Sequence, residues 1–274
     1  MTINCKGKLI SLEQPKIMGI LNITPDSFFD GGKYTDDRDV LHQVEKMLRE
    51  GATFIDLGAY STRPGAAEVD QSIELQRIVP IVDLVLKNFP DTLLSIDTFR
   101  SKAAKTCITH GAAIINDISA GMQDEDMLKT VASLHVPYIM MHMRGTPQDM
   151  QQHTTYTDLV KDVLSFFSER LDIAKSLGIK DIIIDPGFGF AKNISQNFEL
   201  LNHLELLQIT EHPILAGLSR KSMIYKTLNT KADQALNGTT ALHMVCLQKG
   251  AKILRVHDVK EAWECIKLYE QLNA

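Results

Sequence analysis

The 274-residue sequence contains four cysteines, and none of them forms a CxxC pair. Cys5, Cys107, Cys246 and Cys265 are far apart, which indicates reduced thiols rather than a disulfide framework or a zinc site. No apolar run is nearly as long as the about 18 residues that a membrane-spanning helix needs. The first ten residues, MTINCKGKLI, lack the long apolar segment of a signal peptide. We therefore expect a cytoplasmic protein with no membrane partner.

Several common catalytic and nucleotide-binding motifs are also missing. The stretch GFGF at 187–190 lacks the GxGxxG spacing of a dinucleotide site, and the chain has no GxxxxGK[ST] phosphate loop. A GxSxG nucleophile motif is absent as well. These absences disfavour a dinucleotide-dependent enzyme, a P-loop nucleotide hydrolase and a serine hydrolase.

The charge balance is mildly acidic. The chain has 29 basic and 34 acidic residues, so its formal net charge is −5. This balance disfavours nucleic acid as a partner, although a local basic patch remains compatible with a small anion. With 44% hydrophobic and 23% charged residues, the composition is that of a globular protein with a substantial core.

Short apolar runs of strand character alternate with helical patterns along the chain. We expect an α/β fold, a single (β/α)₈ TIM barrel over residues 1–274, with a short entry segment at about 1–14. A doubly wound open sheet is the main alternative, because it shares the same alternation. The chain has eight strand–helix units, each with a polar residue at or just after its strand, and this favours a closed barrel over an open sheet. The expected strands are 17–22, 53–58, 93–97, 113–117, 137–141, 181–185, 213–217 and 252–256.

The helical segments carry three local expectations. Pro80 lies inside the helix expected over about 71–87, so that helix should be kinked or divided. Asp124 is expected to cap a helix that ends near residue 133. Asn237 and Gly238 are expected to separate a short helical stretch from a main helix over 239–249.

Three groups with acceptor oxygens follow apolar strands. Asp97 and Asp185 each end a strand, and Asn116 lies near the end of another. Buried carboxylates are costly unless they are paired, so capping a helix or bracing a loop is one interpretation. The other is recognition of a heterocycle with an N–H beside an amino group, since one carboxylate accepts from both. Such an edge is found in pteridines and purine-like rings.

Positively charged groups are expected at the same barrel mouth. Arg255 and His257 lie two residues apart at the last strand and so point the same way, while Arg63 lies in a loop. Lys221 and Ser222 open a helix whose free N–H groups suit an anion. Simple ion pairing or a solvated helix start would also account for them. Together they predict a phosphate or diphosphate site.

Asn22 follows the first strand of the expected barrel. It is either an ordinary turn residue or a ligand for a hard cation. Mg²⁺ takes few protein ligands and keeps water and substrate phosphate oxygens around it. Asn22 is therefore the candidate ligand for a Mg²⁺ cofactor.

The chain resembles the dihydropteroate synthases. The resemblance is carried by seven blocks in family order, from residue 19 to residue 259, which is nearly the whole chain. The blocks are GILNITPDSFFDGG (19–32), STRPGA (61–66), SIDTFR (95–100), INDISAG (115–121), IIDPGFGFAK (183–192), LSRKSM (218–223) and RVHDV (255–259).

The resemblance implies a reaction and a set of roles. The family joins 6-hydroxymethyl-7,8-dihydropterin diphosphate to 4-aminobenzoate, giving 7,8-dihydropteroate and pyrophosphate, and sulfonamides inhibit it. By motif, the catalytic group would be Asp97, Lys221, Arg63 and Arg255. The implied substrate-binding residues are Asn116, Asp185, Lys221 and Arg255 for the pterin, Arg63, Arg255 and His257 for the diphosphate, Thr62, Pro64, Phe28, Phe190 and Ser222 beside the aminobenzoate, and Asn22 for Mg²⁺.

The resemblance also implies a homodimer formed through the last helices, and mobile lids at 23–36 and 61–70. A few positions depart from common family residues, among them Ala191, where glycine is frequent, and Leu218, where threonine is frequent. Two rival functions are a methyltetrahydrofolate-dependent methyltransferase, which would need no diphosphate site, and a non-catalytic pterin-binding barrel, in which damaged motifs would be expected.

Overall fold

A computed structural model describes residues 1–23, 37–59 and 69–273. It contains a closed barrel of eight parallel strands in the order β10-β3-β4-β5-β6-β7-β8-β9. Closure is direct, since β10 pairs in parallel with both β9 and β3. The predicted barrel is thus confirmed and the open sheet is excluded. The strands are β3 (Lys16–Asn22), β4 (Phe54–Gly58), β5 (Leu93–Asp97), β6 (Ile114–Asp117), β7 (Tyr138–Met141), β8 (Ile182–Asp185), β9 (Ile214–Ala216) and β10 (Ala251–Val256).

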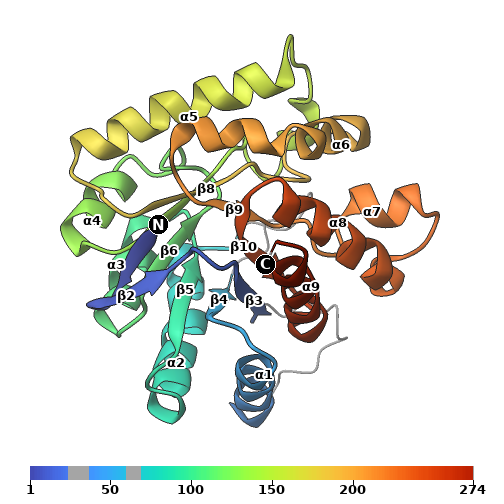
Figure 1. Cartoon of the computed structure of the whole chain (residues 1–274). Helices are drawn as coiled ribbons and strands as arrows, with labels where there is room; N and C mark the ends of the chain where they lie inside the picture. The colour runs from blue at the N-terminus through green and yellow to red at the C-terminus, as the bar shows by residue number, and fades with distance from the viewer. Residues whose placement is uncertain (24–36, 60–68, 274) are drawn as a thin grey trace.

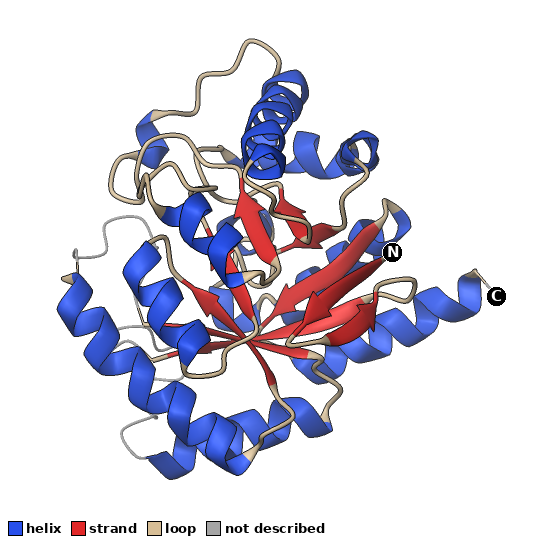
Figure 2. Ribbon diagram, turned by 90° about the vertical axis from the view of Figure 1, so that its left-hand side faces the viewer, coloured by secondary structure: helices blue, strands red, loops and turns tan. Residues whose placement is uncertain are grey.

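Helices surround the strands on the outside of the barrel (Figures 1 and 2). None of the described helices is long and apolar enough to cross a membrane. The helices are α1 (Asp37–Arg49), α2 (Gln71–Asn88), α3 (Ser101–Thr109), α4 (Met127–Leu134), α5 (Leu159–Ser176), α6 (Ile194–Asn202), α7 (Ser222–Thr227), α8 (Leu236–Gln248) and α9 (Val259–Leu272), with short 3₁₀ turns η1 (Met150–Gln152), η2 (Leu204–Thr210) and η3 (Ala232–Gln234).

The barrel interior has an apolar floor to which each strand contributes one residue. Because side chains alternate between the two faces of a strand, the residues on either side of each floor residue point outward to the helices. Burial of each large aliphatic side chain contributes about 1.5–3 kcal/mol. The floor residues are Met18, Phe54, Leu93, Ile114, Ile139, Ile183, Leu215 and Ile253.

The N-terminal segment closes the barrel beneath this floor. It forms an antiparallel hairpin of β1 (Thr2–Cys5) and β2 (Lys8–Ser11). Its buried side chains, Ile3, Cys5 and Ile10, join the floor residues in one hydrophobic cluster. Figure 1 shows the hairpin lying across the barrel strands. The opposite end of the barrel is therefore the end that is left for a ligand.

The structure corrects the three local helix predictions. Helix α2 is not divided at Pro80 but runs as one helix from Gln71 to Asn88. Asp124 is not the N-cap of α4, which is Asp126; one oxygen of its carboxylate accepts from the backbone N–H of Asp126 at 3.0 Å and the other from that of Ser101 at 2.7 Å, at the start of α3. Helix α8 begins at Leu236 and includes Gly238, where an added Cβ would lie 2.6 Å from Ile224 Cγ2. Gly238 thus permits close packing of α7 against α8 instead of breaking a helix.

Candidate active site

A layer of polar side chains lies directly above the apolar floor. Asp56, Asn116, Asp185 and Arg255 each follow a floor residue by two positions, and Asp97 follows one by four. The period of two in a strand turns all five inward, on the side of the carboxyl ends of the strands. We call these five residues the polar layer. The structure therefore brings together residues that lie up to 199 positions apart in the sequence.

Arg255 is the centre of the polar layer. Its Nε donates a hydrogen bond to Asp56 Oδ2 at 2.6 Å, and its Nη2 donates to Asp97 Oδ2 at 2.7 Å. The amide Nδ2 of Asn116 donates to the same Asp56 oxygen at 3.0 Å. A guanidinium whose Nε and Nη2 are held by two carboxylates has a fixed plane, while its Nη1 is left for another acceptor. Ion pairing of Arg255, one of the alternatives for this residue, thus occurs within the site itself.

Two glycines leave room above the polar layer. An added Cβ at Gly217 would lie 3.5 Å from Asp185 Oδ2 and 3.9 Å from Arg255 Cβ. At Gly58, an added Cβ would lie 3.3 Å from Asn22 Oδ1 and 3.5 Å from Asp97 Cβ. The absence of side chains at these two positions keeps the mouth of the barrel open.

Burial controls the protonation of the carboxylates. Burial raises the pKa of Asp97 to about 7, the nearby Arg255 opposes that rise, and the charge of Asp56 adds to it. The pKa of Asp185 is also raised by burial, and Lys221 opposes the shift. Burial would lower the pKa of Arg255, but Asp56 and Asp97 outweigh it and raise that pKa. Arg255 is therefore charged throughout the physiological range, whereas Asp97 titrates within it.

Lys221 reaches this mouth from the residue preceding α7. Its Nζ donates a hydrogen bond to the carbonyl oxygen of Phe188 and lies 4.5 Å from the centroid of the Phe190 ring. Burial lowers the pKa of Lys221 to about 8, and Asp185 opposes the shift. Lys221 and Phe190 thus come together, and Ser222 follows directly as the first residue of α7.

Lys192 is a buried amine to which the sequence interpretation gave no role. It lies in the loop after β8, and its Nζ forms hydrogen bonds of 3.0 Å with the carbonyl oxygens of Gly187 and Phe190 and with Nδ1 of His142. Burial lowers the pKa of Lys192 to about 7. Its side chain holds the 187–190 turn in place. A lysine directly after GFGFA was the available signal, but sequence spacing does not reveal that it folds back.

His257 and Arg220 brace the ends of β9 and β10. The ring nitrogen Nδ1 of His257 is 3.0 Å from Ser219 Oγ, which also accepts from the His257 backbone N–H at 3.2 Å. Arg220 forms two hydrogen bonds of 2.6 Å to the carboxylate of Asp258. Within the sequence SRKS (219–222), therefore, Arg220 forms a structural ion pair with Asp258, while the side chain of Lys221 extends toward the candidate active site.

Asn22 is the last residue of β3, and its amide oxygen lies beside Gly58, next to Asp97. The described part of the chain contains no cluster of three or more His, Cys, Asp or Glu residues suited to a metal ion. A dedicated protein cage is not needed for Mg²⁺, which is commonly held by one or two protein oxygens and by substrate phosphates. Four predicted site residues lie outside the described residues: Phe28, Thr62, Arg63 and Pro64.

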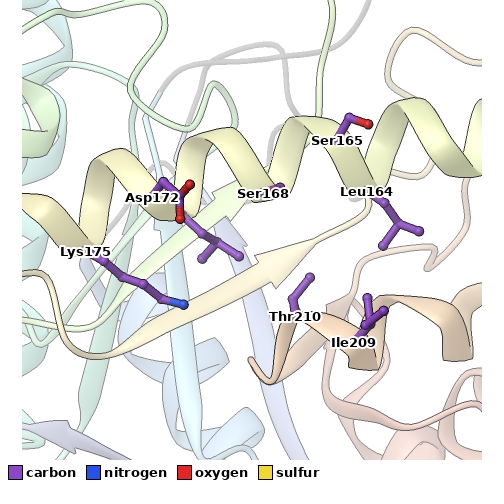
Figure 3. A pocket seen from close by; sticks show the side chains of 8 residues that line it. Leu164, Ser165, Ser168, Asp172, Lys175, Ile209 and Thr210 are labelled. Carbon is purple, nitrogen blue, oxygen red and sulfur yellow. The ribbon is translucent and has the colours of Figure 1, made fainter.

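A cavity of about 430 Å³ lies elsewhere, between α5 and η2 on the outside of the barrel (Figure 3). Its polar lining includes Asp172, Lys175 and Thr210, and Ile209 forms part of its wall. Lys175 and Thr210 precede the strands that begin at Ile182 and Ile214, so the cavity lies toward the floor end of the barrel. It shares no residue with the polar layer and is not part of the candidate active site.

Comparison with known proteins agrees with this geometry. The pterin binding enzyme family matches residues 18–257. Dihydropteroate synthase of Haemophilus influenzae is 43% identical over 272 residues, which cover 98% of both chains.

Two solved structures share the whole fold. Yersinia pestis dihydropteroate synthase in a sulfonamide drug complex has a TM-score of 0.95 and 41% identity, covering 100% of this chain and 99% of its own. Xanthomonas albilineans dihydropteroate synthase with 4-aminobenzoic acid has a TM-score of 0.92 and 37% identity, covering 100% and 98%. The chain therefore belongs to the pterin binding enzyme family, within its dihydropteroate synthases.

Proposed function

We propose that this protein condenses 6-hydroxymethyl-7,8-dihydropterin diphosphate with 4-aminobenzoate to give 7,8-dihydropteroate and pyrophosphate. The observation that carries the proposal is the meeting, in one barrel mouth, of an acceptor-rich layer with Arg255 and Lys221. A flat heterocycle with N–H donors suits the acceptor-rich layer, and a departing anion suits the two basic side chains. Family membership over almost the full chain supports the same reaction.

The pterin is bound by the polar layer. Asp185 has an exposed fraction of 6% and Asn116 of 4%, so each is buried yet reachable from the mouth. A carboxylate of this kind accepts two parallel hydrogen bonds from an amino group and an adjacent ring N–H. Because water has little access there, a ligand that lacks these donors would leave the carboxylate with the Gly187 N–H but without the two ligand donors, and would bind poorly.

The diphosphate is held at the cationic side of the mouth, by Arg255, His257 and Arg63. Arg255 uses Nε and Nη2 for Asp56 and Asp97, while its Nη1 has no acceptor among the described residues. That amino group is available to an incoming oxyanion. Arg63 lies outside the described residues, so its part in this group rests on its place in the STRPGA motif.

Asn22 fits a role as the protein ligand of Mg²⁺. It offers a hard amide oxygen next to the Asp97 carboxylate, and oxygen donors are the ones that Mg²⁺ selects. When bound, Mg²⁺ neutralises charge on the diphosphate and so makes it a better leaving group. The other charges on the leaving group are offset by the basic side chains described above.

The reaction breaks the bond between the pterin methylene carbon and the diphosphate oxygen, which keeps the electron pair. The lone pair of the arylamine then forms the new C–N bond, and the arylammonium loses a proton. Positive charge that develops on the methylene carbon is stabilised by the electron-rich ring and by the ionised carboxylate of Asp97. No side-chain nucleophile is required, in keeping with the absence of nucleophile motifs.

The 4-aminobenzoate is bound beside the 187–190 turn, near Phe190 and Ser222; Phe28, Thr62 and Pro64, which lie outside the described residues, are assigned to the same subsite by their motifs. Phe190 is half-buried and packs against the apolar cluster that contains Met141 and Ile118. Loops 23–36 and 61–70 would close over both substrates and exclude water from the reactive carbon. Sulfonamides would compete at this subsite, as analogues of the arylamine.

We further propose a cytoplasmic homodimer that uses the face formed by α7, α8 and α9. Exposed apolar side chains on α9 and just after α7 support this face, with Leu228 54%, Leu268 63% and Leu272 69% exposed. Sedimentation of wild-type protein and of Leu268→Glu tests it. A dimer that dissociates in the variant is expected, and a wild-type monomer contradicts it.

The activity itself is tested by incubating the protein with Mg²⁺, the pterin diphosphate and 4-aminobenzoate. We expect pyrophosphate and dihydropteroate to form in equal amounts. Absence of turnover together with tight binding of methyltetrahydrofolate would instead identify a methyltransferase.

A further inference from the structure

Asp56 is the deepest charged residue of the polar layer, and its exposed fraction is 0%. Its Oδ2 accepts hydrogen bonds from Arg255 Nε at 2.6 Å and from Asn116 Nδ2 at 3.0 Å. Arg255 and Asn116, which are themselves only slightly exposed, thus lie against Asp56 in the layer. Asp56 therefore cannot contact a ligand, and any function it has must act through these two neighbours.

Stability does not explain why a carboxylate occupies this position. Asp56 Oδ1 is fully buried and has no hydrogen-bond partner among the residues that the structure describes. Leaving an oxygen of a buried carboxylate without a partner is costly, and a buried ion pair seldom contributes more than an apolar replacement. A costly buried group that touches two substrate-binding side chains points to a role in function.

The contact with Asp56 determines which end of the Asn116 amide faces the mouth. A carboxylate oxygen repels a carbonyl oxygen and attracts an N–H, so the amide must turn Nδ2 toward Asp56. Asn116 Oδ1 is then the end turned away from Asp56, and it has no hydrogen-bond donor among the described residues. Together with the carboxylates of Asp97 and Asp185, it gives the deep end of the pocket a surface made of acceptors.

The same carboxylate fixes Arg255. Nε is bound to Asp56 and Nη2 to Asp97, so the plane of the guanidinium is set by two carboxylates from different strands. If the Asp56 contact were lost, the guanidinium could rotate about its remaining bond to Asp97. The two groups that meet the pterin and its diphosphate therefore share a single anchor, Asp56 Oδ2.

We propose that Asp56 is a positioning residue whose Oδ2 orients both Asn116 and Arg255, and thereby selects for a heterocycle with adjacent N–H donors. This inference rests on the proposed function. It assigns to Asp56 a hydrogen-bond role, in which the acceptor oxygen matters more than the charge.

Substitutions at Asp56 separate the acceptor from the charge. Asp56→Leu keeps the branched arrangement of heavy atoms and removes the acceptor, whereas Asp56→Asn keeps one acceptor oxygen and removes the charge. Affinities are measured by calorimetry, with Mg²⁺, for the pterin diphosphate and for an analogue that lacks the 2-amino group. We expect Asp56→Leu to reduce the preference for the natural ligand by about tenfold, since a mobile Asn116 amide can meet either ligand. We expect Asp56→Asn to stay within about threefold of wild type.

A matched control is available in the neighbouring strand. Ser95 is the Cα partner of Asp56 across the β4–β5 pair and is equally buried, with no hydrogen-bond partner for its hydroxyl among the described residues. Ser95→Ala changes a side chain at the same depth of the barrel that forms no hydrogen bond with Asn116 or Arg255, and should keep the wild-type preference. If Asp56→Leu does not fold, Asp56→Ala provides the same comparison, because it also removes the acceptor.

The proposal is overturned if a folded Asp56→Leu or Asp56→Ala variant keeps the wild-type preference, or if Asp56→Asn loses as much as Asp56→Leu. The second outcome would show that the charge matters and not the acceptor. Failure of the proposed function is seen separately, because the wild-type protein would then neither bind the pterin diphosphate nor turn it over.

Discussion

At the scale of single residues, the site depends on a few buried charges that stabilise one another. Asp97 and Asp56 both face Arg255, and neither would be tolerated at such low exposure without that cation. The sequence identified Asp97, Asn116, Asp185 and Arg255 because each ends or follows an apolar run. Asp56 ends the apolar run TFID in the same way and was expected among the polar groups at the strand ends, but the sequence gave it no chemical role. Arg255, from which Asp56 accepts a hydrogen bond, lies 199 residues away in the sequence.

The pH dependence of kcat/KM should report Asp97. Its pKa is raised to about 7, so the carboxyl is mostly neutral below that pH and charged above it. In the proposed reaction a charged Asp97 stabilises the methylene cation, and kcat/KM should therefore rise with pH through about 7. Lys221, with a pKa lowered to about 8, loses its charge at higher pH, and the rate should fall again.

The control for this prediction is Asp97→Asn, which cannot ionise. Its activity should be low and its profile should lack the rise near neutral pH. If the variant keeps that rise, the titrating group is the substrate or another side chain, and the role of Asp97 as a charged stabiliser is wrong.

Arg255→Ala should lower both the stability of the protein and its affinity for pyrophosphate, and Arg255→Lys should largely separate these two effects. Loss of the guanidinium leaves Asp56 and Asp97 buried without a counter-charge, which should lower the free energy of unfolding by about 3–5 kcal/mol. It should also weaken pyrophosphate binding by more than about tenfold, through loss of the positive charge and of the Nη1 donor. Arg255→Lys keeps the charge and should recover more stability than affinity. Urea unfolding and calorimetry measure the two quantities, and unaltered pyrophosphate affinity in Arg255→Ala would contradict the assignment.

At the scale of elements, the loop after β8 shows how a segment without regular structure can be held rigid. Lys192 bonds two carbonyl oxygens of the turn, and Asp185 Oδ1 accepts from the Gly187 N–H at 2.8 Å. Gly187 also needs to be glycine, since an added Cβ would lie 2.1 Å from the His142 carbonyl oxygen. The loop thus carries both Phe190 and the carbonyl that binds Lys221 in fixed positions.

Ala191 is a strained residue in this loop. Its φ angle is +50°, in the left-handed region that glycine adopts readily and alanine does not. The frequent glycine at this position in the family therefore has a conformational reason. Ala191→Gly should raise the free energy of unfolding by about 1 kcal/mol, with kcat unchanged. Thermal unfolding monitored by circular dichroism measures this, and Gly178→Ala, at φ +86°, should show the opposite sign.

At the scale of the whole molecule, stability and function occupy different depths of one barrel. The apolar floor and the β1–β2 hairpin pack against each other, and the polar layer starts two residues further along the strands. The packing role of Leu12 is visible only in the whole molecule. Leu12 lies in a short polar segment of the sequence, yet its side chain is fully buried beneath the floor.

Leu12→Ala should therefore destabilise the protein without impairing the site. We expect the free energy of unfolding to fall by about 2–4 kcal/mol, as for other buried leucines. The KM values for both substrates should not change at a temperature where the variant remains folded. Leu9→Ala is the control, because Leu9 lies three residues earlier, in β2, and is 69% exposed. Equal destabilisation by both variants would contradict the assigned packing.

The sequence by itself determined the strands, their order along the chain and the residue types at their ends, since these follow from local periodicity and motif spacing. The strand boundaries agree with prediction to within one residue. Local pattern failed at Pro80, Asp124 and Gly238, because α2 tolerates its proline and the other two residues serve contacts with distant segments. Only the tertiary structure decided that Asp56, Asn116, Asp97 and Arg255 form one hydrogen-bonded group. Barrel closure sets such contacts by placing the last strand beside the first, a spatial relation that spacing along the chain does not contain.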